Sequence, residues 1–322
     1  MKNYKPIIIV AGEPNSIFLE IYFKALKSKR YKSPLILICS KKILLNEMKK
    51  FKFKKKIKLI ESYNLNKMQL NNDSINLLNV KLDLPKKKMK SFTKSNHYIK
   101  ECFDLAFKIL KNGSTNKFIN GPISKKKFLN KKFLGMTEYV SKKFNTKKNA
   151  MLIYNKELSV CPITTHLPLK SVANNINKSL IIEKIKLIYD FYLKYLMQKP
   201  KIAVLGLNPH CESIHKFNED EKILEPVINY MKKKNFKVYG PYPADTIFLK
   251  NNRKKYDVIL GMYHDQVLTP LKTLYEYDAI NITLGLPFIR VSPDHGPNEK
   301  MVGKNLSSPL SLIKALKFLD KI

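Results

Sequence analysis

Short apolar runs alternate along the chain with polar turns and amphipathic segments. The runs are bounded by Gly, Pro or polar residues and predict buried strands of a mostly parallel sheet. They cover residues 6–11, 34–39, 117–120, 150–154, 158–163, 202–207, 257–262 and 279–284. Amphipathic spacing predicts helices over residues 17–26, 96–110, 171–198, 219–234 and 308–321. The alternation of the two patterns predicts an α/β protein.

The most informative stretch runs from Tyr256 to Pro297, where apolar strands end in polar turns. One predicted strand ends on Tyr263-His264-Asp265-Gln266, and a later turn reads Ser292-Pro293-Asp294-His295-Gly296. Ligands of open α/β sheets bind at the carboxyl ends of such strands. We therefore expect functional side chains in these turns.

Three histidines, His166, His210 and His264, directly follow apolar strands. Brought together, three imidazoles make a site for a divalent metal with an open position for substrate. Alternatively, each could be a hydrogen-bonded loop histidine. Because all three occupy the same kind of position after a strand, this alternative is the weaker interpretation. Asp245 and Asp265 are the nearest acidic partners for metal-bound imidazoles, although Asp245 also fits a helix cap.

Lys272, Asn281 and Arg290 offer two cations and an amide to an anionic substrate. Lys272 is equally well explained as a surface residue, because lysine is so frequent in this chain. Arg290 is more informative, because only three of the 61 basic residues are arginine.

The formal net charge of +36 raises the possibility of a protein that binds nucleic acid or a membrane surface. A phosphate- or base-reading protein is expected to use arginine, and here the lysines are spread along the whole chain. We therefore favour a solvated lysine-rich surface and expect neither nucleic acid nor a membrane as partner.

Four cysteines, Cys39, Cys102, Cys161 and Cys211, form no CxxC pair. This usage is typical of reduced thiols in a cytosolic protein. No apolar run approaches the roughly 18 residues of a membrane span, so we expect a cytoplasmic protein. No Gly-x-Gly-x-x-Gly follows the first strand, and a nicotinamide cofactor must therefore bind in another way.

Eight segments resemble the 4-hydroxythreonine-4-phosphate dehydrogenase family of pyridoxal phosphate biosynthesis. They are Gly12-Glu13-Pro14, Asn120-Gly121-Pro122-Ile123-Ser124-Lys125, Gly135-Met136-Thr137-Glu138, Thr164-Thr165-His166-Leu167-Pro168-Leu169, Gly206-Leu207-Asn208-Pro209-His210, Gly240-Pro241-Tyr242-Pro243-Ala244-Asp245-Thr246, Met262-Tyr263-His264-Asp265-Gln266 and Asn281–Arg290. They occur in the family's order over nearly the whole chain. Residues 42–95 carry little of the resemblance.

The resemblance implies a two-lobed α/β/α subunit of the isocitrate/isopropylmalate dehydrogenase type, with a cleft between the lobes. The first lobe would comprise residues 1–125 with about 290–322. The second, residues 126–289, would carry most metal and substrate residues. It also implies a homodimer with a shared active site, to which the partner subunit supplies one metal ligand.

The chemistry implied is oxidation of 4-phosphooxy-L-threonine at its 3-hydroxyl by NAD, or by NADP, and then decarboxylation to 3-amino-2-oxopropyl phosphate. A divalent cation (zinc, magnesium or cobalt) would be held by His166, His210 and His264. Substrate contacts would include Thr137, Lys272, Asn281 and Arg290. Asp245 and Lys272 are the candidates for the proton acceptor.

Two departures from the family pattern concern the substrate. The family has a substrate-contacting histidine where this chain has Met136, whose thioether forms no strong hydrogen bond. The opening loop has Asn15-Ser16-Ile17-Phe18 where the family has further glycines. A related dehydrogenase acting on 4-phosphoerythronate or 4-phosphothreonate is therefore the alternative, with an inactive metal-binding relative as a third possibility. A non-catalytic binder of nucleic acid or lipid is the alternative from another class.

Overall fold

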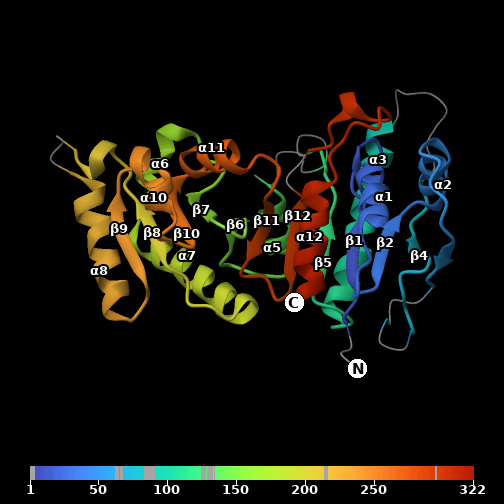
Figure 1. Ribbon diagram of the computed structural model, residues 1–322, viewed down its shortest axis with the longest axis horizontal. Coiled ribbons are helices and arrows are strands. Elements are labelled where there is room, and N and C mark those ends of the chain that lie inside the picture. Colours follow the sequence, from blue (N-terminus) through green and yellow to red (C-terminus); the bar gives the residue numbers. More distant parts are fainter. Residues whose placement is uncertain are drawn as a thin grey trace. The chain divides into compact units, whose positions relative to one another are not determined.

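The computed structural model describes residues 4–61, 65, 68–82, 91–124, 128, 133, 135–213, 217–293 and 296–322. The chain divides into two compact units (Figure 1). The first unit comprises Met1–Met136 and Pro287–Ile322, and the second comprises Thr137–Leu286. Each unit contributes its own strands and helices.

The first unit contains a parallel sheet of apolar strands. Their order is β3-β4-β2-β1-β5-β12, and the described pairs in this unit are all parallel. The strands are β1 (Ile7–Val10), β2 (Leu35–Cys39), β3 (Ile57–Leu59), β4 (Ile75–Asn79), β5 (Lys117–Asn120) and β12 (Ile289–Pro293). β1 and β2 are buried at every position, which is why they are apolar throughout instead of alternating.

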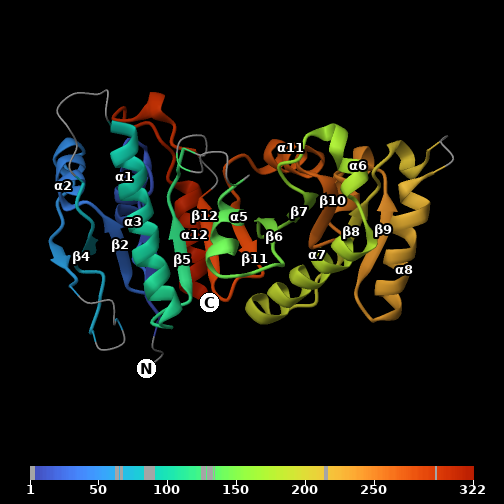
Figure 2. The same cartoon turned by 180° about the vertical axis from the view of Figure 1, so that it is seen from behind.

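Helices cover both faces of this first sheet. α1 (Phe18–Ser28) and α12 (Leu310–Lys321) lie in front of the strands in Figure 1, and α3 (Ser91–Lys111) lies in front of them in Figure 2, the reverse view. α2 (Lys41–Lys50) follows β2, and η7 (Glu299–Met301) is a single 3₁₀ turn. The first unit therefore has the helix–sheet–helix layering expected of an α/β fold.

The second unit contains a mixed sheet. Its strand order is β11-β6-β7-β10-β8-β9. The strands are β6 (Ala150–Tyr154), β7 (Ser159–Thr164), β8 (Ile202–Leu205), β9 (Val238–Tyr242), β10 (Val258–Tyr263) and β11 (Ile280–Leu284). β6 runs antiparallel to β11 and β7, whereas β7, β10, β8 and β9 run parallel. The carboxyl ends of β7, β10 and β8 therefore lie side by side at one edge.

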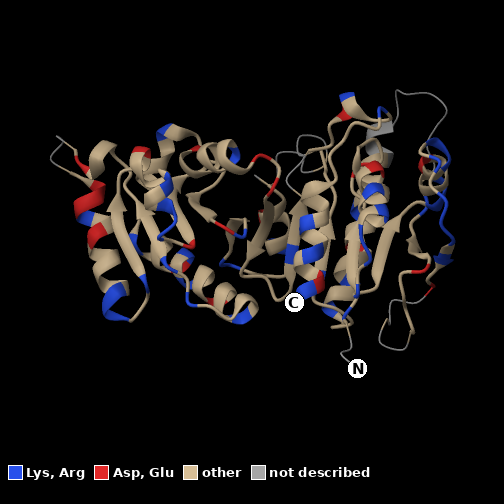
Figure 3. Cartoon of the chain, in the orientation of Figure 1, with Lys and Arg blue, Asp and Glu red and all other residues tan. Residues whose placement is uncertain are grey.

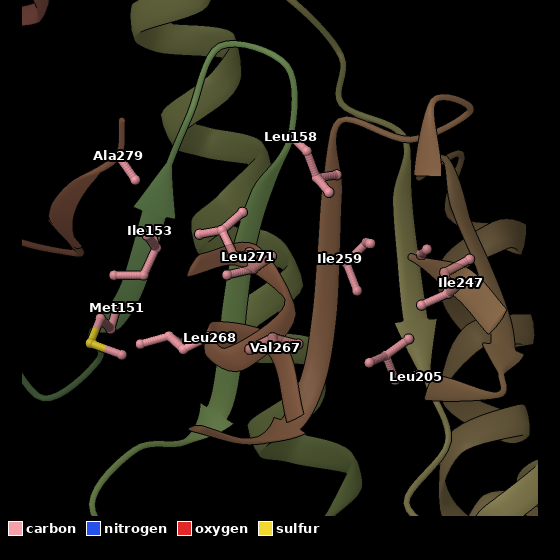
Figure 4. Close-up of a cluster of buried hydrophobic side chains, with 12 residues drawn as sticks. Met151, Ile153, Leu158, Leu205, Ile247, Ile259, Val267, Leu268, Leu271 and Ala279 are labelled. Carbon is pink, nitrogen blue, oxygen red and sulfur yellow. The ribbon is translucent and has the colours of Figure 1, made fainter. Parts of the chain in front are cut away.

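The helices of the second unit are α5 (Met136–Lys143), η3 (Leu169–Ser171), α6 (Val172–Asn175), α7 (Lys178–Phe191), η4 (Tyr192–Leu196), η5 (Pro209–Cys211), η6 (Asp220–Leu224), α8 (Glu225–Lys233), α9 (Ala244–Ile247), α10 (Lys250–Arg253) and α11 (His264–Tyr275). Among them, α7, α8 and α11 contact strands of this sheet. In Figure 4, Val267, Leu268 and Leu271 of α11 project among strand residues that include Ile153 and Ile259. This apolar packing fixes α11, and so its first residue, against the sheet.

One predicted helix differs from the structure. The apolar spacing from Ser171 to Gln198 predicts a single helix, but α6 ends at Asn175 and α7 begins at Lys178. Ile176 is extended, and the Asn177 side chain accepts a hydrogen bond from the Leu180 backbone N–H at 2.9 Å. An asparagine at this position starts a new helix instead of continuing the previous one.

Two candidate residues lie inside regular elements. Arg290 lies within strand β12, where residues 289–291 pair with β5. Thr137 is the second residue of α5. Among the described residues, no helix is both long and apolar enough to span a bilayer.

Candidate active site

The three candidate histidines follow three neighbouring strands of the second unit. His166 comes two residues after β7, His264 comes directly after β10 and opens α11, and His210 lies in η5 after β8. Since β7, β10 and β8 are adjacent and parallel, the chain segments that leave them start at the same edge of the sheet.

His166 and His264 form a pair at that edge. Their ring centroids are 6.1 Å apart, with the ring planes tilted by 35°. The pairing follows from the register, because Thr164 of β7 lies opposite Tyr263 of β10. Two imidazoles at this separation provide two nitrogen donors to one small volume.

Each ring of this pair has a carboxylate beside its Nδ1 atom. Asp265 Oδ1 lies 2.6 Å from Nδ1 of His264, as expected for an acidic partner in that turn. Glu138 Oε1, from α5, lies 4.0 Å from Nδ1 of His166. Sequence reasoning assigned no role to Glu138. Its position beside Thr137 was the only available signal.

His210 stands apart from this pair within one chain. It is exposed, and its φ of 55° places it in the left-handed region. In the part of the chain that the structure describes, no three His, Cys, Asp or Glu side chains are grouped closely enough to hold a metal. The sequence expectation of a three-histidine cluster is therefore not met by a single chain.

A buried carboxylate holds the turn that leads to His210. Asp220 is 1% exposed and accepts hydrogen bonds from the backbone N–H groups of Leu207 at 2.7 Å and Asn208 at 3.1 Å. The Asn208 Nδ2 group donates to the same carboxylate at 2.9 Å. The sequence analysis assigned no role to Asp220 either, because this residue lies in the charged segment after His210.

Gln266 connects the carboxyl ends of β10 and β8. Its Oε1 accepts a hydrogen bond from the Met262 backbone N–H at 2.7 Å, and its Nε2 donates to the carbonyl oxygen of Gly206 at 2.8 Å. Both ends of the amide are used. The side chain therefore fixes the spacing of the two strand ends that lead to His264 and His210.

Asp245 lies in the first turn of α9 and is exposed. The N-cap position of that helix is Pro243, so the interpretation of Asp245 as a cap is wrong. α9 follows β9, which is the neighbour of β8 in the sheet. Asp245 remains a candidate for proton transfer.

Three substrate candidates belong to the second unit. Thr137 is half-buried on α5, and Lys272 is exposed on α11. Asn281 lies on β11 opposite Ile153 of β6. Its Oδ1 atom is buried and has no hydrogen-bond partner among the described residues. A buried amide oxygen of this kind is costly for the fold unless a ligand satisfies it.

Two further candidates belong to the first unit. Arg290 is 3% exposed, and its Nε donates to Asn120 Oδ1 at 2.8 Å. Met136, the first residue of α5, is buried. The Arg290 guanidinium is therefore buried and is fixed on its Nε side by a neutral amide.

Two of the segments that carry the family resemblance lie side by side in the first unit. The Glu13 backbone N–H donates to the carbonyl oxygen of Pro122 at 2.8 Å. Gly12 has a φ of +81°, and a Cβ atom there would lie 2.3 Å from that oxygen. Only glycine fits, which explains the Gly-Glu-Pro segment physically. Lys125, Asp294 and His295 of neighbouring segments lie outside the described residues.

Basic residues occur on elements of both units (Figure 3). The spread agrees with the sequence interpretation of a lysine-rich surface. It contrasts with the His166–His264 pair, where both flanking charges are carboxylates. The chemistry of this edge therefore differs from that of the general surface.

Comparison with known proteins gives a consistent family assignment. The family model described as pyridoxal phosphate biosynthetic protein PdxA matches residues 30–319. A 4-hydroxythreonine-4-phosphate dehydrogenase of Sulfurihydrogenibium sp. (strain YO3AOP1) is 36% identical over 96% of this chain and 96% of its own. A D-threonate 4-phosphate dehydrogenase of Pectobacterium atrosepticum is 36% identical over 60% of this chain and 62% of its own.

Solved structures agree with the sequence matches. A 4-hydroxythreonine-4-phosphate dehydrogenase of Klebsiella pneumoniae has a TM-score of 0.84 and 26% identity, covering 99% of both chains. A β-decarboxylating dehydrogenase of Thermococcus kodakarensis has a TM-score of 0.51 and 10% identity, covering 98% of this chain and 82% of its own. The latter likeness concerns the fold alone and confirms the predicted α/β fold class.

Proposed function

Because the chain belongs to the PdxA family of pyridoxal phosphate biosynthesis, we propose that it oxidises 4-phosphooxy-L-threonine at the 3-hydroxyl and then releases the carboxylate. The observation that carries this proposal beyond family membership is the His166–His264 pair with a carboxylate on each ring. A non-catalytic basic binding protein would have no need of that arrangement.

The donor set suits a divalent transition metal. Imidazole nitrogens favour zinc or cobalt, whereas magnesium prefers oxygen ligands. His166 and His264 would hold the cation, which when bound acts as a Lewis acid toward a substrate oxygen. The carboxylates of Glu138 and Asp265 reduce the cost of gathering positive charge there. The residues present therefore fit a metal, with zinc or cobalt preferred to magnesium.

His210 would be the ligand that the partner subunit supplies. It is exposed, and the buried Asp220 holds its turn in a defined conformation. A preformed, exposed turn is well suited to enter the site of a second copy of the chain. The proposed assembly is therefore a homodimer in which each active site needs both subunits.

The proposed reaction balances in two steps. The C3 carbon loses a hydride to NAD, or to NADP, and its hydroxyl loses a proton, which gives a ketone beta to the carboxylate. The bond between that carboxylate and C2 then breaks, carbon dioxide leaves, and C2 gains a proton to give 3-amino-2-oxopropyl phosphate. Asp245 and Lys272 are the proposed proton acceptors.

The substrate anions and polar groups would be held by Thr137, Asn281, Lys272 and Arg290. Arg290 matches carboxylate or phosphate through its planar fork. Asn281 supplies a buried amide that lacks a partner among the described residues. Met136 offers only a non-polar surface at the position where the family contacts substrate through histidine, and so bears on substrate choice.

The experiment is a dehydrogenase assay on the purified protein. We expect NADH to form with 4-phosphooxy-L-threonine, to stop after a chelator, and to resume after zinc or cobalt is added. NADH formation that continues unchanged after the chelator is added would contradict the metal assignment. Absence of turnover in every metal-loaded sample would contradict the proposed reaction.

A second candidate substrate class is favoured by Met136. The Pectobacterium relative is named for D-threonate 4-phosphate, a phosphorylated acid without an amino group. D-threonate 4-phosphate and 4-phosphoerythronate should therefore be assayed in parallel. A kcat/KM at least tenfold higher for either would assign this chain to that substrate class.

A further inference from the structure

Each histidine of the pair in the second unit has a carboxylate near its ring, a feature that family membership alone does not explain. In both rings, it is Nδ1 that faces a carboxylate: Asp265 for His264 at 2.6 Å, and Glu138 for His166 at 4.0 Å. The two carboxylates come from different elements, Asp265 from α11 and Glu138 from α5. The two contacts differ in length, because the first is a hydrogen-bond distance and the second is an ion-pair distance.

Glu138 has a feature that its fold does not explain. Its Oε2 atom is buried and lacks a hydrogen-bond partner among the described residues. A buried carboxylate oxygen without a partner is unfavourable. The other oxygen of the same carboxylate, Oε1, lies 4.0 Å from Nδ1 of the His166 ring.

We propose that Glu138 is a positioning residue for His166 and that Asp265 has the same function for His264. Asp265 accepts the Nδ1–H of His264 at 2.6 Å, and Glu138, whose Oε1 lies 4.0 Å from Nδ1 of His166, accepts that N–H once a metal draws the ring into place. Each carboxylate so selects the tautomer with the lone pair on Nε2. Both histidines would then meet the cation through Nε2. The inference rests on the metal site of the proposed function and specifies which nitrogen atoms form it.

A purely structural function for Glu138 makes a different prediction. Glu138 lies in the first turn of α5, where a negative charge interacts favourably with the helix dipole. If that were its whole function, its removal would lower stability slightly and leave the tautomer of His166 unchanged. Metal affinity would also be unchanged.

The first test measures binding of Zn²⁺ alone to full-length protein, by competition with a chromophoric chelator. We expect Glu138→Gln to weaken binding by about 10- to 100-fold. We expect Asp265→Asn to weaken it to a similar extent. Glu138→Asp should recover part of the loss. The matched control is Glu183→Gln, which removes a carboxylate paired with Lys184 on α7 and should bind zinc as the wild type does.

The second test measures the tautomer of each histidine directly, and its main result comes from the wild-type protein. Long-range ¹H–¹⁵N spectra of ¹⁵N-histidine-labelled protein identify the protonated nitrogen of each ring. We expect Nδ1–H in His166 and His264 of the metal-free protein at pH 8, and an altered His166 signal in Glu138→Gln. An Nε2–H tautomer in wild-type His166 would overturn the inference.

The outcomes separate this inference from the proposed reaction. Zinc binding that is unaffected by Glu138→Gln overturns the positioning function even when the enzyme is active. Wild-type protein that binds no zinc also overturns it. Zinc binding that depends on Glu138, in a protein that reduces no NAD with any substrate tested, supports the inference and contradicts the reaction.

Discussion

The guanidinium Nε of Arg290 donates a 2.8 Å hydrogen bond to Oδ1 of Asn120. The two residues lie on β12 and β5, which are parallel neighbours in the first unit, with Arg290 opposite Phe118. Arg290 is almost fully buried and is one of only three arginines in the chain. The hydrogen bond therefore holds the buried guanidinium group of Arg290 against the end of β5.

Replacement of this arginine should impair substrate binding. In Arg290→Lys, the planar fork and the bond to Asn120 are both lost. Charge-assisted hydrogen bonds contribute about 1.5–3 kcal/mol, so kcat/KM should fall by about tenfold or more, mainly through KM. The control is Arg253→Lys, whose guanidinium donates to the Phe248 carbonyl oxygen. An unchanged KM would show that Arg290 has only a structural function.

The turn before His210 should depend on Asp220. In Asp220→Asn, an amide replaces the carboxylate that accepts from Leu207 and Asn208. We expect the free energy of unfolding to fall by about 2–3 kcal/mol, because buried donors lose a charged acceptor. Urea denaturation measures this change. Glu221→Gln, at the exposed neighbour, should leave stability within about 0.5 kcal/mol.

Zinc binding by variants of the histidine pair and by a variant of His210 should depend differently on protein concentration. His264→Ala should lose zinc binding at every concentration. His210→Ala should retain weaker binding through the remaining pair, and its affinity should no longer rise with dimerisation. Sedimentation together with metal analysis tests this difference. Equal loss in both variants in a purely monomeric sample would contradict the proposed contribution of the partner subunit.

Met136 should restrict substrate choice. In Met136→His, a hydrogen-bonding ring replaces a buried thioether at the start of α5. We expect kcat/KM for 4-phosphooxy-L-threonine to rise relative to the phosphorylated sugar acids, by about tenfold for one added hydrogen bond. Ratios of kcat/KM from parallel assays measure the change. A fall for all substrates alike would indicate a packing function only.

Cys211 should react slowly with alkylating reagents. Burial and the nearby Asp220 raise the pKa of its thiol to about 11. At pH 8, about one thiol in a thousand is then ionised, and the thiolate is the reactive form. The alkylation rate, followed by mass spectrometry, should still increase about tenfold per pH unit between pH 8 and 10. A plateau near pH 9 would show an unperturbed thiol.

The sequence predicts well what depends on local pattern. Ile7–Val10 and Lys117–Asn120 are strands because they are apolar or buried throughout, and Gly or Pro ends them. The fold class follows from such alternation and is confirmed. The prediction of one helix from Ser171 is wrong at Asn177. The apolar periodicity continues through this residue, but its side chain caps the start of a new helix.

The site is predicted less completely, because its geometry depends on strand order. Sequence identifies the three histidines by their positions after strands. It does not show that β10 lies beside β7, which brings His166 close to His264. Glu138 and Asp220 were missed for a related reason. Each acts across a distance in the chain, and an acidic residue on a helix is ordinarily a solvated one.

The insertion of β10 between β7 and β8 has a consequence for synthesis of the protein. β7 and β8 are made first, but the edge of each that pairs with β10 has no neighbour until β10 has left the ribosome. Long-range parallel pairings of this kind form late in folding. A nascent chain therefore exposes two unpaired strand edges during elongation, and the His166–His264 pair can form only after residue 264 has emerged.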